Sequence, residues 1–345
     1  MLAAGLRGCK DNGMSQVTRR NFCKGAVAAV MALQGEVFAK GGKAQAEAGF
    51  RGKPFVKWAG GKGQLLEQLD AFFPRALREG KIKAYVEPFV GGGAMLFHIL
   101  THYPAIERVI INDLNADLTG VYRVVKECPQ ALIAALRDIQ AEFFALEEMA
   151  ARKDYYLAKR ARYNARSAEA VEQAALFIFL NRTGFNGLYR VNASGEYNVP
   201  FGKAKRPQIC DEQTLLADSR LLQKVEILTG DFAGVAERMT EPAFVYLDPP
   251  YRPLPKTPSF TAYAKEGFND DQQRRLAAFC RTLDAQGHRW LLSNSDPANT
   301  DPEDTFFDEL YRGFEIHRVY ASRMINAKAD GRGKITELAI RNYQE

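Results

Sequence analysis

The sequence Ala243-Phe244-Val245-Tyr246-Leu247-Asp248-Pro249-Pro250-Tyr251 joins a five-residue apolar run to a polar corner. The run is short and free of charge, which predicts a buried strand over 243–247. The two prolines that follow oppose both continued strand pairing and an immediate helix. We therefore expect a stiff corner at 248–251, at the carboxyl end of a strand, where open α/β sheets bind their ligands.

The 248–251 corner carries a carboxylate, an outward carbonyl and an aromatic ring. This set suits a flat substrate that bears an amino group, such as adenine. A surface turn after a buried strand would have the same local sequence, so the rest of the chain has to decide between the two.

A second strand is predicted over 82–87, followed by a glycine-rich turn at 88–93 and a helix over 94–101. A strand, a glycine turn and a helix together can cradle a nucleotide-like ligand at the helix N-terminus. No Gly-Lys-Ser/Thr follows the glycines, so the turn is not a phosphate-binding P-loop. The strand predicted over 108–111 ends near Asp113, about twenty residues beyond the turn, where a carboxylate can bind ribose hydroxyls. These features indicate a nucleoside ligand without a pyrophosphate, and S-adenosylmethionine fits that description.

The remaining patterns complete an α/β chain. A loop containing Gly60 and Gly61 precedes a helical pattern over 65–73, and helical patterns fill 115–180 with a break at Pro129. Further elements are predicted as strands over 225–229, 290–293, 315–321 and 334–343, a helix over 270–285, a lid-like loop over 254–267, and polar loops over 294–304 and 322–333.

Positive charge is concentrated in one segment of the 345-residue chain, whose formal net charge is +6. Residues 152–206 contain eleven basic and four acidic side chains, a net +7 that accounts for the whole excess. Tyrosine and phenylalanine are interleaved with the basic residues, a mixture typical of phosphate contacts and base stacking. A solvated helix face would also carry such charge.

Residues 181–202 are dense in Asn and Arg and predict a hairpin that turns at 193–195. Asn and Arg pair bidentately with adenine and guanine edges in the major groove of DNA. A purely structural hairpin is the alternative interpretation.

The first 49 residues differ from the rest of the chain. Arg19-Arg20 precedes an apolar stretch over 26–33 and Ala44-Gln45-Ala46, which is close to a twin-arginine export signal. A functionally irrelevant extension is the alternative. The five cysteines are scattered without a disulfide or zinc-binding spacing, and no apolar run is long enough to cross a membrane.

Five motifs follow one another in the order found in a known family. They are Lys57-Trp58-Ala59-Gly60-Gly61-Lys62, Glu87-Pro88-Phe89-Val90-Gly91-Gly92-Gly93, Asn112-Asp113, the 181–202 segment and the 248–251 corner. On these residues the chain resembles the Dam-type DNA adenine-N6 methyltransferases of the D12 class, which use S-adenosylmethionine to methylate adenine within GATC. The resemblance spans about 54–343 and leaves the N-terminal extension outside.

The resemblance implies a Rossmann-like α/β methyltransferase domain, with a mixed, mostly parallel twisted sheet and helices on both faces. An inserted, largely helical DNA-recognition domain would end in a β-hairpin. The corresponding division is an N-terminal extension at 1–49, a catalytic domain at 50–114 and 211–345, and a target-recognition domain at 115–210.

The resemblance also implies roles for particular residues. The cofactor S-adenosylmethionine would be bound by Trp58, Lys62, Glu87, Pro88, Phe89, Gly91, Gly93, Asp113, Asp231 and Asp248. The catalytic residues Asp248, Pro249, Pro250 and Tyr251 would hold an adenine flipped out of the duplex. The DNA contacts would come from Lys57, Arg182, Asn186, Tyr189, Arg190, Asn192 and Asn198, with Arg190 as the principal reader of sequence. No metal is implied.

The residue types of the corner suit this chemistry. The amino nitrogen of adenine is a poor nucleophile because its lone pair delocalises into the ring. Asp248 and the carbonyl of Pro249 can accept the two amino hydrogens and favour a pyramidal nitrogen, while Tyr251 stacks on the base. Holding both reactants in place would supply much of the rate acceleration.

Several alternatives stay open from the sequence. The target could be another DNA sequence, RNA or a protein amide, or the chain could bind DNA without catalysis. A nicotinamide-dependent oxidoreductase fits less well because the glycine turn lacks dinucleotide spacing. Since S-adenosylmethionine and the genome are cytoplasmic, we expect a cytoplasmic enzyme that acts on double-stranded DNA as a monomer, without membrane contact. Export is the alternative if the N-terminal signal is functional.

Overall fold

The computed structural model describes residues 51–252, 268–322 and 334–345. The expected export signal and the predicted loop at 254–267 lie outside these ranges, as does nearly all of the loop at 322–333. Within the described ranges, no helix is both long and apolar enough to span a membrane.

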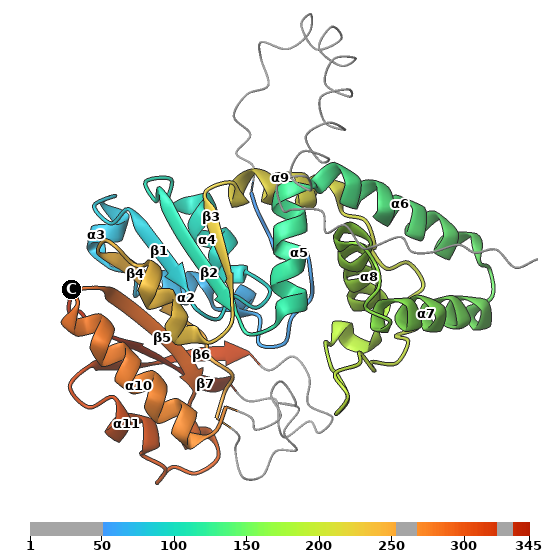
Figure 1. The fold of residues 1–345 in the computed structure, drawn as a ribbon. Helices are drawn as coiled ribbons and strands as arrows, with labels where there is room; N and C mark the ends of the chain where they lie inside the picture. The colour runs from blue at the N-terminus through green and yellow to red at the C-terminus, as the bar shows by residue number, and fades with distance from the viewer. Residues whose placement is uncertain (1–50, 253–267, 323–333) are drawn as a thin grey trace, which may run out of the picture. The chain divides into compact units, whose positions relative to one another are not determined.

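The described residues build a single mixed sheet of seven strands (Figure 1). The strands are β1 (Ala84–Glu87), β2 (Arg108–Asp113), β3 (Val225–Thr229), β4 (Ala243–Leu247), β5 (Arg289–Ser295), β6 (Glu315–Ser322) and β7 (Lys334–Arg341). Their order is β3-β2-β1-β4-β5-β7-β6. Strands β1 to β5 are parallel to one another, whereas β7 runs antiparallel to both β5 and β6. The predicted mixed, mostly parallel sheet is confirmed.

The strand order contains one switch point. From β1 the chain moves outward to β2 and β3, then returns to place β4 on the other side of β1. Connections that leave β1 and β4 in opposite directions open a crevice at the carboxyl ends of these two strands. The glycine turn follows β1 and the 248–251 corner follows β4, so the topology brings both motifs to this crevice.

Helices lie on both faces of the sheet, and a further helical group extends beyond it (Figure 1). The helices of the described residues are α2 (Leu66–Asp70), α3 (Arg75–Arg78), α4 (Ala94–His102), α5 (Ala116–Glu127), α6 (Pro129–Ala145), α7 (Met149–Asn164), α8 (Ala170–Thr183), α9 (Glu212–Leu222), α10 (Asp270–Ala285) and α11 (Phe306–Leu310). Short 3-10 turns lie at η1 (Lys62–Gln64), η2 (Phe185–Gly187), η3 (Phe232–Arg238) and η4 (Pro297–Asn299).

The alternation of side chains along β4 divides the core in two. Phe244 and Tyr246 join a cluster that includes the buried residues of α4, α5, α8 and α9. Val245 and Leu247 join a second cluster with α10 and α11. Because successive side chains of a strand point to opposite faces, an apolar run without alternation indicates a strand buried on both sides. This confirms the strand predicted over 243–247.

Helices α6, α7 and α8 follow α5 in the chain and pack on one another, as the green elements of Figure 1 show. Helix α8 is buried over most of its length and contacts α5, α6 and α7. Helix α5 also packs against β2 and β3. It therefore links the sheet to this helical group.

The 181–202 segment folds back on itself but forms no regular strands. Antiparallel pairing is limited to the isolated bridges Gly184–Phe201 and Val191–Tyr197. Side-chain amides replace much of the expected ladder, since Asn164 Oδ1 accepts a bond from the Tyr197 amide and its Nδ2 donates to the Tyr197 carbonyl. The result is a compact irregular loop in place of a regular hairpin.

Other local predictions differ from the structure. The predicted helix over 65–73 is broken into η1, α2 and, after Pro74, α3. Helix α9 was missed, although Asp211 accepts a bond from the Thr214 amide and caps its start. Helix α11 was also missed, because its single turn is too short to show a helical period.

Asp218 on α9 is fully buried, and its Oδ1 accepts a bond from the Lys53 amide at 3.1 Å. Its Oδ2 has no hydrogen-bond partner within the described part of the chain. Burial raises the pKa of this carboxyl from an ordinary value of 3.8 to about 8. The folded protein therefore favours the protonated acid, and its stability should fall as pH rises from about 4 to about 8.

We predict that Asp218→Asn stabilises the protein at pH 8 by about 1–3 kcal/mol, because a neutral amide replaces a buried carboxylate. The gain should shrink toward pH 4, where wild-type Asp218 is protonated. Urea unfolding across this pH range measures the difference. Asp271→Asn, at an exposed carboxylate of α10, serves as the control. Equal stabilities of Asp218→Asn and wild type at pH 8 would contradict the prediction.

Candidate active site

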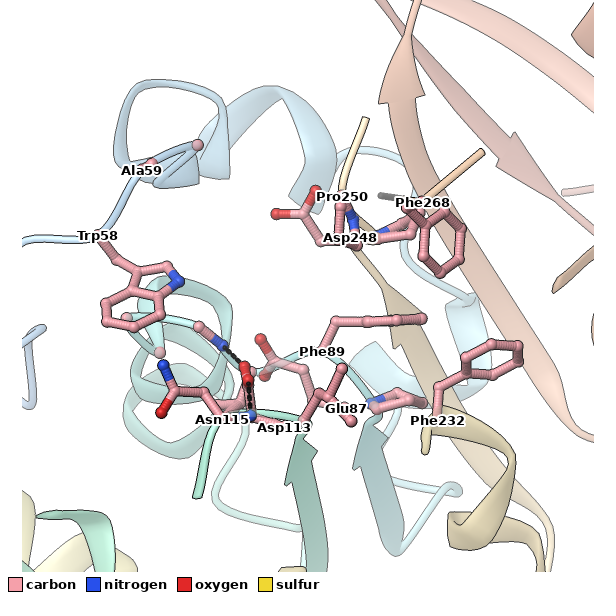
Figure 2. A pocket seen from close by; sticks show the side chains of 18 of the residues that line it. Trp58, Ala59, Glu87, Phe89, Asp113, Asn115, Phe232, Asp248, Pro250 and Phe268 are labelled. Carbon is pink, nitrogen blue, oxygen red and sulfur yellow. Dashed lines mark hydrogen bonds between the residues drawn. The ribbon is translucent and has the colours of Figure 1, made fainter. Parts of the chain in front are cut away.

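A cavity of about 800 Å³ opens at the carboxyl edge of the sheet around the β1/β4 switch point. It collects every residue predicted to bind a cofactor or to act in catalysis. These are Trp58, Lys62, Glu87, Pro88, Phe89, Gly91, Gly93, Asp113, Asp231, Asp248, Pro249, Pro250 and Tyr251. Figure 2 shows Trp58 and Asp113 on one side of this cavity and Asp248 and Phe268 on another.

Trp58 forms one wall of the cavity and is held in place from behind. The side-chain amide of Asn181 accepts from the Lys57 backbone N–H at 2.8 Å and donates to the Lys57 carbonyl at 2.8 Å. The indole stacks on Tyr189 at 5.6 Å and lies close to Phe177 at 6.4 Å between ring centroids. An aromatic wall held in this way can stack on a planar ligand.

The glycine turn passes directly beneath Trp58. Gly91 has φ +48°, and a Cβ added there would lie 2.9 Å from Trp58 Cδ1. Gly93 has φ +78°, and a Cβ there would lie 2.4 Å from the Tyr122 hydroxyl. Left-handed backbone together with this crowding requires glycine at both positions.

Asp113 at the end of β2 faces the same turn (Figure 2). Its carboxylate accepts from the Gly91 backbone N–H at 3.0 Å and from the Asn115 N–H at 2.9 Å. Burial raises the pKa of this carboxyl, and the two backbone donors oppose the shift. Each carboxylate oxygen keeps a further acceptor position, so Asp113 can still receive a hydroxyl hydrogen from a ligand.

Three phenylalanines line another side of the cavity. Phe89 lies 5.3 Å from Phe232 and 5.8 Å from Phe268 between ring centroids. Such an apolar group suits the flat face of a heterocyclic base.

Lys62 and Asp248 form a mostly buried ion pair at the centre of the site. Lys62 Nζ lies 2.8 Å from Asp248 Oδ1, with side-chain exposures of 5% and 20%. It also donates to the Gly60 carbonyl at 3.2 Å and sits 4.6 Å above the Tyr251 ring. Burial raises the pKa of the Asp248 carboxyl, and the ammonium of Lys62 opposes that shift.

The backbone of the 248–251 corner is braced by the neighbouring elements. The fully buried Gln273 of α10 donates from Nε2 to the Pro250 carbonyl at 3.3 Å and accepts from Asn294 of β5 at 3.1 Å. Beyond the corner, Arg252 binds Asp270 and Asp304 at 2.7 and 2.6 Å. The corner is therefore rigid on both sides of Tyr251.

Asp231 lines the cavity but is already engaged. It forms a two-point ion pair with Arg275 of α10, at 2.7 and 2.5 Å. Its assignment as a cofactor ligand stays a prediction, because a bound ligand would have to share this carboxylate with Arg275.

The residues predicted to contact DNA are more dispersed. Lys57, Asn186 and Arg190 are exposed, and the Arg190 guanidinium is oriented by two bonds to Asn198. Asn192 closes the turn by accepting from the Ser194 and Glu196 amides.

Two of the predicted DNA contacts have structural partners. Tyr189 lies in the cavity wall, with its hydroxyl bonded to Asp117, and Arg182 donates to the Phe55 carbonyl at 2.8 Å. The structure does not bring these two side chains to the exposed part of the segment. Their contact with DNA stays a prediction.

Sequence reasoning missed residues that organise the site. Glu337 of β7 accepts a bond from the Tyr251 hydroxyl, and Gln273 holds the corner. Asp117 of α5 accepts hydrogen bonds from the hydroxyls of Tyr163 and Tyr189 at 2.6 and 2.8 Å. The acid at Asp117 was visible only as a favourable charge in a first helical turn, and neither Glu337 nor Gln273 lies in a motif.

The arrangement can bind two flat ligands and one polar chain. Its glycine turn, its carboxylate at the end of β2 and its aromatic walls fit S-adenosylmethionine, and the 248–251 corner can accept amino hydrogens. Within the described residues, no group of three or more His, Cys, Asp or Glu is arranged to hold a metal ion.

Comparisons with known proteins identify the family to which the chain is similar. A family described as D12 class N6 adenine-specific DNA methyltransferase matches residues 58–325. The chain is 51% identical over 294 residues to the Type II methyltransferase M.MjaIII of Methanocaldococcus jannaschii, covering 84% of this chain and 99% of that protein. It is 38% identical to the Type II methyltransferase M1.LlaDCHI of Lactococcus lactis subsp. cremoris, covering 84% and 95%. It is 33% identical to the DNA adenine methylase of Escherichia coli K12, covering 84% and 94%.

We predict that Lys62→Met raises the pKa of Asp248 further, because the opposing ammonium is lost. A carboxyl whose pKa is raised on folding destabilises the protein as pH rises, so the variant should lose stability relative to wild type between pH 5 and 8. We expect a loss of about 2 kcal/mol at pH 8, less than for fully buried pairs because Asp248 is partly exposed. Urea unfolding at both pH values tests this, with Lys57→Met as the exposed control. A loss that does not depend on pH would contradict it.

Proposed function

Because the chain belongs to the D12 class N6 adenine-specific DNA methyltransferases, we propose that it methylates the N6 amino group of adenine in double-stranded DNA, within GATC. The observation that carries the proposal is the Lys62–Asp248 pair beside the Pro249-Pro250-Tyr251 corner, in the same cavity as the glycine turn. S-adenosylmethionine, when bound, would supply the electrophilic methyl group.

The cofactor would be held by the part of the cavity between Trp58 and the glycine turn. Trp58, Phe89 and Phe232 offer apolar faces, Asp113 offers acceptors for hydroxyls, and the Gly91–Gly93 backbone allows close approach. Lys62, Glu87, Pro88, Asp231 and Asp248 complete the proposed contacts.

The target adenine would enter at the 248–251 corner. Asp248 and the Pro249 carbonyl would accept its amino hydrogens, and Tyr251 would stack on its ring. Burial raises the pKa of Asp248, and the ammonium of Lys62 opposes that shift and so favours the ionised carboxylate beside the amino group. An ionised carboxylate accepts stronger hydrogen bonds than a neutral acid and favours the developing positive charge on nitrogen.

We propose that residues 115–210 form the target-recognition part and that 50–114 and 211–345 form the catalytic part. The basic excess of 152–206 and the exposed Lys57, Asn186 and Arg190 support this division. Helix α5 belongs to both parts, since it packs against the sheet and against α8.

The relatives named DNA adenine methylase support the choice of GATC, because these share 33–36% identity over most of the chain. The Type II methyltransferases are more similar still, at 51% and 38% identity, and they support a role for the same activity in a restriction–modification system. We place the reaction in the cytoplasm, because the cofactor and the genome are there, and we propose that the enzyme acts as a monomer. Export remains the alternative for the N-terminal signal.

We predict that Asp248→Ala reduces methyl transfer at least about 1,000-fold, because the amino group loses its charged acceptor. The measurement is incorporation of labelled methyl groups into duplex DNA. Asp271→Ala, which removes an exposed carboxylate from α10, should leave the rate unchanged. Near-normal incorporation by Asp248→Ala would refute the proposed mechanism.

A second prediction concerns sequence preference. Arg190→Ala should reduce discrimination at one base pair by about 1–3 kcal/mol, because its exposed guanidinium can donate two hydrogen bonds to a guanine edge. Methylation rates on duplexes with single substitutions in the site measure this effect. Lys153→Ala, at an exposed position of α7, should instead weaken binding to all sequences alike or not at all. Uniform weakening by Arg190→Ala would identify a phosphate contact.

A further inference from the structure

The antiparallel strand β7 brings an acidic residue to the catalytic edge of the sheet. Parallel strands present their last residues at this edge, whereas an antiparallel strand presents its first ones. In the register of the sheet, Glu337 near the start of β7 pairs with Ser295 at the end of β5. Glu337 therefore lies at the same edge of the sheet as Asp248, although β7 runs in the opposite direction to β4.

Glu337 contacts two residues of the site at once. Its Oε2 accepts the hydroxyl hydrogen of Tyr251 at 2.5 Å and lies 3.8 Å from Lys62 Nζ. The Glu337 side chain is only 16% exposed. The Lys62 ammonium thus lies between two carboxylates, with Asp248 as the nearer one.

The backbone around Glu337 is firmly placed. Asn299 of η4 accepts from the Thr336 backbone N–H at 3.0 Å and donates to the Thr336 carbonyl at 2.7 Å. The Thr336 hydroxyl donates to Asp296, which is almost fully buried, at 2.6 Å. These bonds hold the backbone of Thr336, from which the next residue, Glu337, extends its side chain to Lys62 and Tyr251.

We propose that Glu337 is a positioning residue for methyl transfer, which fixes the Tyr251 ring and the Lys62 ammonium around the reacting adenine. The inference rests on the proposed function of the same site. The Tyr251 hydroxyl donates to Glu337 Oε2, and the Lys62 ammonium lies 4.6 Å from the centroid of the same ring. The Glu337–Tyr251 bond holds the far end of that ring. Attraction between the Glu337 carboxylate and the Lys62 ammonium keeps the ammonium over the Tyr251 ring as well as beside Asp248.

The test compares Glu337→Ala, Glu337→Gln, Tyr251→Phe and the double variant Tyr251→Phe/Glu337→Ala. The readouts are the single-turnover rate with DNA and S-adenosylmethionine saturating, and the Kd of each ligand. We expect Glu337→Ala to lower the rate about 10- to 100-fold, the effect of a lost charge-assisted hydrogen bond, with either Kd changing by less than about threefold. Glu337→Gln retains an acceptor for Tyr251 and should recover part of the rate.

The double variant separates positioning from an independent effect. If Glu337 acts through Tyr251, the double variant should be no slower than the slower single variant. Glu315→Gln serves as the control and should leave the rate unchanged. Glu315 is another ion-paired carboxylate, which begins β6 and binds Arg341 at the end of β7. Should Glu337→Ala fail to fold, the same cycle is made with Glu337→Gln.

A wild-type rate in Glu337→Ala, fully additive losses, or a rate loss matched by weaker binding of both ligands would each overturn the proposal. Wild-type protein without methyl transfer to adenine would instead overturn the proposed function. Crystal structures provide a readout that needs no activity. Displacement of Tyr251 or Lys62 in Glu337→Ala supports positioning, and unchanged side chains contradict it.

Discussion

The ion pair between Lys62 and Asp248 connects parts of the chain that are far apart in sequence. Lys62 begins η1, close to the start of the described residues, and Asp248 follows β4. A mostly buried ammonium is stable only with its charge and its hydrogens matched, and here Gly60, Asp248 and Glu337 surround it. The site is therefore complete only when the loop that contains Gly60, strand β4 and strand β7 are all folded.

The proposed recognition part also contributes to the cavity that is proposed to bind the cofactor. Trp58 is held by Asn181 at the end of α8 and stacks on Tyr189 of the irregular loop. The Tyr189 hydroxyl in turn bonds to Asp117 in the first turn of α5. One wall of the pocket is thus built from the segment proposed to read DNA. A physical connection of this kind lets occupancy of the pocket and the shape of the loop influence one another.

Local sequence patterns identified the parts of this structure that depend on local chemistry. A charge-free run before two prolines predicted β4 and its corner, and a glycine turn followed by Asp113 predicted the crevice beside β1. Helix α9 was not predicted, although Asp211 caps its start. The 181–202 loop was expected to pair as a hairpin, but side-chain amides such as that of Asn164 took over the backbone groups.

Other features depend on topology and could not be read from any motif. Glu337 reaches the site because β7 runs antiparallel to β5, and nothing in the residues around it specifies that direction. The packing of the Tyr189 ring against Trp58 likewise joins residues far apart in the sequence, and no local pattern indicates it.

The most direct measurement is to express the chain in a host without adenine methylation and map modified bases across its genome. N6-methyladenine at nearly every GATC, and absent with Asp248→Ala, is the predicted result. An unmodified genome, or methylation of cytosine, would contradict the proposed activity.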